Sequence, residues 1–220
     1  MAHLKREQSP KQWPIERKGT TYLVRPSYNI DQGIPVLLVL RDVLKFAKTR
    51  REVRKALNAK QVLLNGKEVF DEGSSAVLFD VITIMSQDGK QEKDYKVTIG
   101  RNKKFHVEEI SKEKAGHKIA KIINKKTLKG KKTQINLSDG RNFISDVKCK
   151  VNDSVLIDLK NKKLERVLPL KENTKVIVFA GKHAGENGMI KGIEDKNKIA
   201  QIDSDGKMVN ILIKQLMVLE

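Results

Sequence analysis

A dense run of basic side chains stands out in residues 49–69, TRREVRKALNAKQVLLNGKEV. Its cations fall on one side of a predicted helix: Arg50, Arg51, Arg54 and Lys55. Guanidinium and ammonium groups placed together bind phosphate oxygens through charge-assisted hydrogen bonds. The pair Asn65-Gly66 follows between apolar runs, a pattern typical of a β-hairpin. The stretch is therefore either a solvated helix before a hairpin or a small module that holds a polyanion.

The residue types used in catalysis and metal binding show no comparable pattern. The four histidines lack metal-ligand spacing: His3, His106, His117 and His183. Acidic residues stand mostly in turns, as Asp139 does in SDGR, where turn chemistry accounts for them. Cys149 is the lone cysteine, so no intrachain disulfide is possible and a small buried hydrophobe is its ordinary role. We predict no metal, no cofactor, no small-molecule substrate and no enzymatic activity.

The overall charge points to a polyanionic partner. The 220 residues carry 45 Lys and Arg against 27 Asp and Glu, a net charge of +18. The excess lies in two blocks, with 14 basic against 5 acidic residues in 1–60 and 12 against 3 in 101–132. Blocks of this density favour nucleic acid. No apolar run approaches the ~20 residues of a membrane span, so we expect no membrane partner. The single cysteine and the absence of an apolar secretory segment favour the cytoplasm.

Two short helices are predicted to present the first basic block. Pro35 fits the first turn of a helix that begins near Val36. Its apolar side is expected to hold Leu40, Val43, Leu44 and Ala47, and its basic side Arg41, Lys45 and Lys48.

The second helix begins at a capping box. Thr49 is expected to cap the helix and Glu52 to reach back to it. The buried stripe should hold Val53, Ala56 and Leu57, which leaves the basic side chains off the core. We therefore expect reversal of Arg50, Arg51 and Arg54 to glutamate to spare the fold.

Residues 1–35 are expected to form a basic arm. Its prolines interrupt any helix: Pro10, Pro14, Pro26 and Pro35. Cations alternate with Trp13, Tyr22 and Tyr28, a mixture that suits phosphates and unstacked bases and that can order on binding. A second interpretation, in which Trp13 pins the arm to the core, stays open.

The remainder of the chain is expected to be rich in β-strands. DVITIM (80–85), DYKVTIG (94–100) and KKFHVEEI (103–110) have strand patterns, and SKEKAG (111–116) indicates one helical turn. From residue 117, strand-like runs alternate with Lys/Gly-rich and Ser-Asp-Gly turns as far as Pro169. The last fifty residues contain four short strands and a Gly-rich turn, which suits a small SH3-like barrel.

These motifs resemble known modules, and the order of the modules along the chain resembles that of one protein family. Residues 41–69 are similar to the S4-type RNA-binding module, with matches at Arg41, Asp42, Leu44, Thr49, Arg50, Arg51, Glu52, Val62, Asn65, Gly66 and Lys67. Lys60 stands near a place where that family often has Gly, so we expect a different local turn there, with Asn58 adapting. The segment 174–195 resembles a KOW motif. The arm, the S4-type module, INLSDGRN and the KOW element together resemble the ribosomal protein S4e family, in an archaeal rather than a eukaryotic form.

The resemblance implies an α+β, multi-domain protein that binds small-subunit rRNA and supports the particle beside neighbouring small-subunit ribosomal proteins. The expected parts are a basic arm (1–37), the S4-type module (38–93), a β-rich central domain (94–170) and an SH3-like KOW domain (171–220). Two other functions stay open: an RNA-modifying enzyme guided by the S4-type module, and a KOW-type transcription or translation regulator. We expect RNA contacts from Lys5, Arg6, Lys11, Arg17, Lys18, Arg25, Arg41, Lys45, Lys48, Arg50, Arg51, Arg54, Lys55, Lys60, Asn65, Lys67, Lys103, Lys104, Lys129, Lys131, Lys132, Lys182 and His183.

Overall fold

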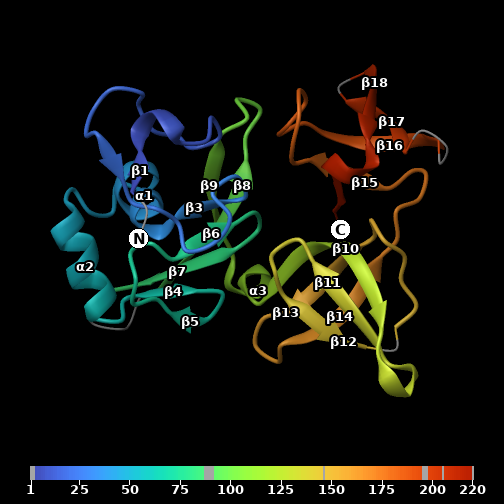
Figure 1. The fold of residues 1–220 in the computed structure, drawn as a ribbon, viewed down its shortest axis with the longest axis horizontal. Helices are drawn as coiled ribbons and strands as arrows, with labels where there is room; N and C mark the ends of the chain where they lie inside the picture. Colours follow the sequence, from blue (N-terminus) through green and yellow to red (C-terminus); the bar gives the residue numbers. More distant parts are fainter. Residues whose placement is uncertain (1–2, 87–91, 146, 195–197, 205, 220) are drawn as a thin grey trace. The chain divides into compact units, whose positions relative to one another are not determined.

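The computed structural model describes residues 3–86, 92–145, 147–194, 198–204 and 206–219. Strands dominate these residues and the helices are few and short, an α+β composition as predicted (Figure 1). The chain divides into two compact units, one of Met1–Ile99 with Lys103–Gly116 and one of Gly100–Asn102 with His117–Glu220. Among the described residues, no helix has the length and apolar character to cross a membrane.

The first unit is built on an antiparallel sheet with strand order β5-β4-β7-β8-β9. The strands are β4 (Val62–Leu64), β5 (Lys67–Glu68), β7 (Val81–Met85), β8 (Glu92–Ile99) and β9 (Phe105–Ile110). Two small ribbons join β1 (Leu4–Lys5) to β2 (Tyr22–Leu23) and β3 (Gly33–Pro35) to β6 (Ser75–Val77). The helical segments are η1 (Arg6–Gln8), α1 (Val36–Leu38), the π-helix η2 (Val39–Val43), α2 (Arg50–Asn58) and α3 (Lys112–Ala115).

The sheet of this unit extends across the domain boundary that we predicted between residues 93 and 94. β8 pairs with β7 on one side and with β9 on the other. The limit that we predicted between residues 93 and 94 falls inside β8, so the strands on both sides of it belong to one sheet. The two units divide after Gly116, with Gly100–Asn102 assigned to the second unit.

The second unit contains two five-stranded antiparallel sheets, ordered β12-β11-β10-β13-β14 and β18-β17-β16-β15-β19. The first has β10 (His117–Thr127), β11 (Thr133–Leu137), β12 (Asn142–Ile144), β13 (Ser154–Asp158) and β14 (Lys163–Leu168), with the turn η3 (Lys129–Lys131). The second has β15 (Lys175–Val178), β16 (Asn187–Glu194), β17 (Ile199–Ser204), β18 (Lys207–Leu212) and β19 (Leu216–Val218), with η4 (Ile213–Gln215). The limit predicted between residues 170 and 171 falls between these sheets, which belong to one unit.

The first helix departs from the predicted regular pattern. Val36 begins it directly after Pro35, as expected, and α1 continues into η2. The N–H of Leu44 donates to the carbonyl of Val39 at 2.9 Å, a five-residue step in place of the usual four. The chain leaves the helix at Lys45, whose φ of 54° is left-handed. Ala47 is buried as predicted, but it lies beyond the helix and not on its face.

The second helix forms as its sequence predicts. Thr49 accepts a hydrogen bond from the N–H of Glu52 at 3.2 Å, and Glu52 accepts one from the N–H of Thr49 at 3.4 Å. This reciprocal pair confirms the capping box. The expected stripe of Val53, Ala56 and Leu57 is buried.

The end of α2 corrects the prediction at Lys60. The N–H of Lys60 donates to the Leu57 carbonyl at 2.9 Å, and the next N–H, of Gln61, to the Ala56 carbonyl at 3.1 Å. This is a Schellman motif, which requires a left-handed residue after the helix. Lys60 supplies it with φ of 58°, so the left-handed turn is kept by the lysine itself and Asn58 remains helical.

Candidate nucleic-acid interface

The basic side chains of α2 have two different roles. Arg51 and Lys55 are exposed one turn apart, and neither forms an ion pair within the described part of the chain. They line an open depression along the helix together with Thr49, Glu52, Arg54 and Asn58. We call Arg51 and Lys55 the α2 cations. Because no described carboxylate forms an ion pair with them, their charge is available to a phosphate backbone.

Arg50 and Arg54 instead hold a buried carboxylate. The side chain of Glu72, 8% exposed, accepts from Arg50 Nε at 2.9 Å and from Arg54 Nη2 at 2.8 Å, and it also accepts from Arg50 Nη2. The two guanidinium groups hold the pKa of Glu72 at about 2, below its usual range. This ion-pair cluster ties α2 to the segment before β6. The expectation that reversal of Arg50 and Arg54 spares the fold is therefore withdrawn.

The lowered pKa of Glu72 predicts a loss of stability in acid. A carboxyl whose folded-state pKa is depressed contributes stability above its unfolded pKa of 4.5, and this contribution is lost as the pH falls toward about 2. The shift corresponds to about 3 kcal/mol, and exposure of both arginines reduces the expected contribution to about 1–2 kcal/mol. Denaturant unfolding of wild type and Glu72→Gln, measured at several values from about pH 6 down to about pH 2, gives this contribution to the free energy of unfolding. The difference between the two proteins should shrink in acid.

Glu68→Gln is the matched control for this measurement. Glu68 pairs with Lys60 at 3.0 Å, but both side chains are largely exposed. Exposed pairs contribute little to stability, so this variant should follow wild type across the range. A Glu72→Gln protein that also follows wild type at neutral pH would contradict the anchoring role.

The predicted hairpin forms at Asn65-Gly66. Both residues have positive φ, 51° and 74°, as a type I′ turn requires. The Asn65 side chain is buried: its Nδ2 donates to Asp80 at 2.7 Å and its Oδ1 accepts from the N–H of Val81 at 3.1 Å. Because the amide is bonded on both sides within the protein, we leave Asn65 out of the RNA surface proposed below.

The N-terminal arm is anchored by Trp13. Its indole is 2% exposed, and Nε1 donates to the Gly33 carbonyl at 3.1 Å. The N–H of Phe105 donates to the carbonyl of the adjacent Gln12 at 2.8 Å. The interpretation that Trp13 pins the arm to the core is therefore confirmed.

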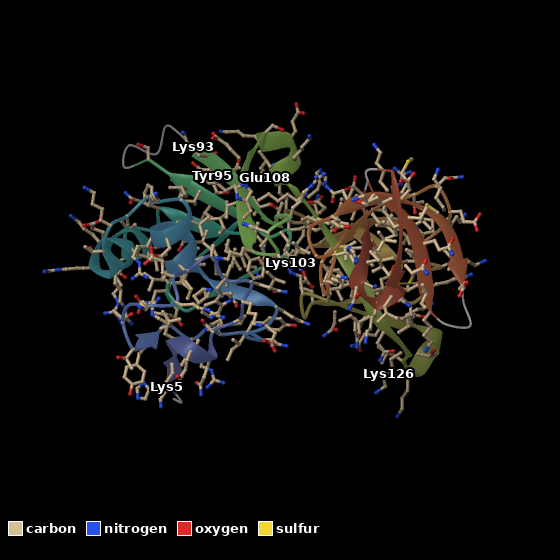
Figure 2. The ribbon with its side chains drawn as sticks, turned by 90° about the horizontal axis from the view of Figure 1, so that it is seen from above. Lys5, Lys93, Tyr95, Lys103, Glu108 and Lys126 are labelled. Atoms are coloured by element: carbon tan, nitrogen blue, oxygen red, sulfur yellow. The ribbon has the colours of Figure 1, made fainter. Side chains whose placement is uncertain are left out.

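The arm uses one cation internally and exposes others. Arg6 donates to the carbonyls of Thr20 at 2.7 Å and Glu16 at 2.6 Å, which closes the loop between them. An open pocket beside this loop is lined by four cations: Arg6, Lys11, Arg17 and Lys104. Further exposed cations of the arm are Lys5, Lys18 and Arg25 (Lys5 is labelled in Figure 2). The exposed ring of Tyr22 lies 5.4 Å from that of His3.

The hairpin of β10 and β11 carries the later part of the second basic block. Its outer end pairs Lys126 with Gln134 and Thr127 with Thr133, beyond the residues of β10 that pair with β13. Lys126, which we did not predict as a contact, is exposed and extends from this hairpin (Figure 2). The predicted Lys129 and Lys132 follow it in the chain and are also exposed.

Two lysines of β10 point into the interior, a burial that the sequence did not predict. Lys118, 2% exposed, donates to Asp139 at 2.8 Å. Lys121, 4% exposed, donates to the carbonyls of Ile213 and Leu216 at 2.5 and 2.8 Å, and burial lowers the pKa of its ammonium to about 8. They show that part of the second basic block belongs to the interior of the unit and not to a binding surface.

The predicted contacts thus fall into three groups. Exposed cations whose side chains form no ion pair within the described residues are Lys5, Lys11, Arg17, Lys18, Arg25, Lys45, Lys48, Arg51, Lys55, Lys67, Lys103, Lys129, Lys132 and Lys182. Those with a partner inside the protein are Arg6, Arg41 with Asp42, Arg50, Arg54, Lys60, Asn65 and His183 with Glu186. Lys104 is half-buried, and the side chain of Lys131 lies outside the described residues.

Comparisons with known proteins agree on one family. The model of Ribosomal family S4e matches residues 91–164, and that of the RS4NT (NUC023) domain matches residues 2–28. Small ribosomal subunit protein eS4 of Methanocella arvoryzae is 36% identical over 195 residues, which cover 87% of this chain and 81% of that protein. The eS4 protein of Methanothermobacter thermautotrophicus is 35% identical over 194 residues, 87% of this chain and 78% of its own.

A solved structure extends the agreement to the fold. The crystal structure of 30S ribosomal protein S4e from Thermoplasma acidophilum matches with a TM-score of 0.74 at 25% identity. The match covers 86% of this chain and 95% of that one. The chain belongs to the S4e family of small ribosomal subunit proteins.

Proposed function

We infer that this chain is a structural constituent of the small ribosomal subunit, and we propose that it binds small-subunit rRNA through separate basic surfaces. The observation that carries the proposal concerns the cations of α2: Arg50 and Arg54 neutralise Glu72, whereas Arg51 and Lys55 have no ion-pair partner among the residues that the structure describes. The charges of Arg51 and Lys55 are therefore available to an anion outside the protein. The family names of the relatives support rRNA as that anion.

We further propose the modules expected from the sequence. The segment from α1 to β5, with its capping box, Schellman end and Asn65-Gly66 turn, corresponds to an S4-type module. The sheet from β15 to β19 corresponds to the KOW element. Neighbouring small-subunit proteins are the expected protein partners.

A non-catalytic role follows in the same proposal. His117 and His183 pair with Glu165 and Glu186 at 2.9 and 3.0 Å, and Asp139 neutralises Lys118. These groups serve ion pairs and turns. The family favours neither of the alternative functions, an RNA-modifying enzyme or a regulator.

Salt dependence tests the proposed binding. If about 6–10 phosphates are neutralised, affinity for a small-subunit rRNA fragment should fall by roughly 10³–10⁵ between low and moderate salt. Binding is measured by filter retention or fluorescence anisotropy over a salt series. Sedimentation of the tagged protein with salt-washed small subunits should show stoichiometric retention. An affinity that does not change with salt concentration would overturn the proposal. Co-purification with RNA polymerase in place of small ribosomal subunits would also overturn it.

A further inference from the structure

Lysine occupies an unusual share of the left-handed backbone positions. Nine described residues other than glycine have positive φ, and five of them are lysines with φ between 52° and 61°. They are Lys45, Lys60, Lys103, Lys162 and Lys198, and all five are exposed.

Backbone chemistry alone does not favour lysine at such a position. The Cβ of an L-residue crowds its own carbonyl in this conformation, whereas glycine adopts it without a steric penalty. Asparagine tolerates it through local hydrogen bonds, as at Asn152 and Asn173 in this chain. The chain also uses glycine there, for instance at Gly206. For contact with a ligand, a lysine at the bend adds a positive charge that glycine lacks.

An internal partner accounts for the charge of one of these lysines. Lys60 Nζ lies 3.0 Å from a carboxylate oxygen of Glu68. Lys198 adjoins residues outside the described part of the chain, and we leave it aside. The others, Lys45, Lys103 and Lys162, form no ion pair or side-chain hydrogen bond within the described residues.

These three positions share one local design. Lys45 follows the end of η2, Lys103 stands in the connection from β8 to β9, and Lys162 stands in the turn from β13 to β14. A side chain at such a bend faces solvent with few neighbours. Its ammonium can therefore approach the sugar-phosphate backbone of an RNA surface without displacing other protein groups.

We propose that Lys45, Lys103 and Lys162, the turn lysines, each contact an rRNA phosphate, and that their strained backbone is retained because glycine cannot supply the charge. The proposal rests on the proposed rRNA binding and names contacts within it. It predicts an opposition between stability and binding at each of these positions, since relieving the strain removes the contact.

Replacement of each turn lysine by glycine, singly and together, tests this opposition. Each of Lys45→Gly, Lys103→Gly and Lys162→Gly should raise the melting temperature by about 2 °C, because the left-handed strain is relieved. Each should also lower the slope of log affinity against log salt by about 1, and the triple variant by about 3. Lysine-to-arginine variants, which keep the charge, should retain the wild-type slope.

Matched controls separate charge from backbone. Asn152→Gly and Asn173→Gly change left-handed positions without a change of charge, so the salt slope should stay at the wild-type value. Lys160→Gln removes a charge two residues from Lys162, in the same turn and with ordinary backbone geometry. Its loss of slope should be smaller than that of Lys162→Gly.

The outcomes distinguish this proposal from the one it rests on. Wild-type protein that binds rRNA while the triple glycine variant binds with the same slope overturns the role of the turn lysines alone. Wild-type protein that fails to bind small-subunit rRNA overturns both. A loss of slope without any gain in melting temperature would overturn the claim that the lysines are kept against a conformational cost.

Discussion

Replacing Arg51 and Lys55 with glutamate is expected to weaken binding to small-subunit rRNA by about 10- to 100-fold at moderate salt. Both side chains are exposed, so the reversal removes the two phosphate contacts that we propose for them and repels the RNA backbone in their place. The fold should survive, because neither residue belongs to the buried stripe or to the Glu72 cluster. Affinity is measured by anisotropy on an rRNA fragment, and folding by circular dichroism and thermal melting.

Two variants with the same change of net charge give this test its controls. Lys171→Glu with Lys175→Glu alters exposed cations outside the proposed surface, and its affinity should fall much less. Arg50→Glu with Arg54→Glu leaves Glu72 without its counterions and places two further carboxylates beside it, so it should cost more than the about 1–2 kcal/mol that the Glu72 cluster contributes. It should therefore lower the melting temperature. Equal losses of affinity for the 51/55 and 171/175 pairs would refute a localised α2 surface.

Replacing Trp13 with alanine is expected to cost about 3–5 kcal/mol of unfolding free energy. The indole is 2% exposed and donates to the Gly33 carbonyl, so truncation leaves a cavity and an unpaired acceptor beside β3. Equilibrium unfolding in urea measures the cost. Limited proteolysis should show new cleavage within residues 3–32, because the arm loses its principal anchor.

Trp13→Phe separates packing from the hydrogen bond. The ring remains buried while the donor to Gly33 is lost, so we expect about 1–2 kcal/mol, well below the cost of alanine. An alanine variant that loses less than about 1 kcal/mol and keeps its arm protected would show that the arm is held elsewhere.

Local sequence signals predicted the elements that position the α2 cations. The start of α2 follows from Thr49 and Glu52, and the hairpin from Asn65-Gly66, because both depend on residues within three or four positions of one another. Strands β7 to β9 follow from their alternation. The exposure of Arg51 and Lys55 also follows, since helical periodicity fixes the side of the helix on which they lie.

The use of each cation did not follow from the sequence, because it depends on distant partners. Glu72 lies 22 residues from Arg50 and 18 from Arg54, with no periodic relation between them. The carbonyl partners of Lys121 lie 92 and 95 residues away. Density of positive charge alone therefore does not define a binding surface, since it counts buried and internally paired cations together with exposed ones.

The buried lysines of β10 have a consequence for chemical footprinting of the assembled particle. Amine-reactive reagents modify lysines that solvent can reach, and RNA shields those it covers. Lys118 and Lys121 are shielded before any RNA is present, at 2% and 4% exposure. Lys121 would be labelled only after its hydrogen bonds to the carbonyls of Ile213 and Leu216 break. Its labelling would therefore report the opening of the second unit, and would serve as an internal reference against which protection of the surface lysines by rRNA is read.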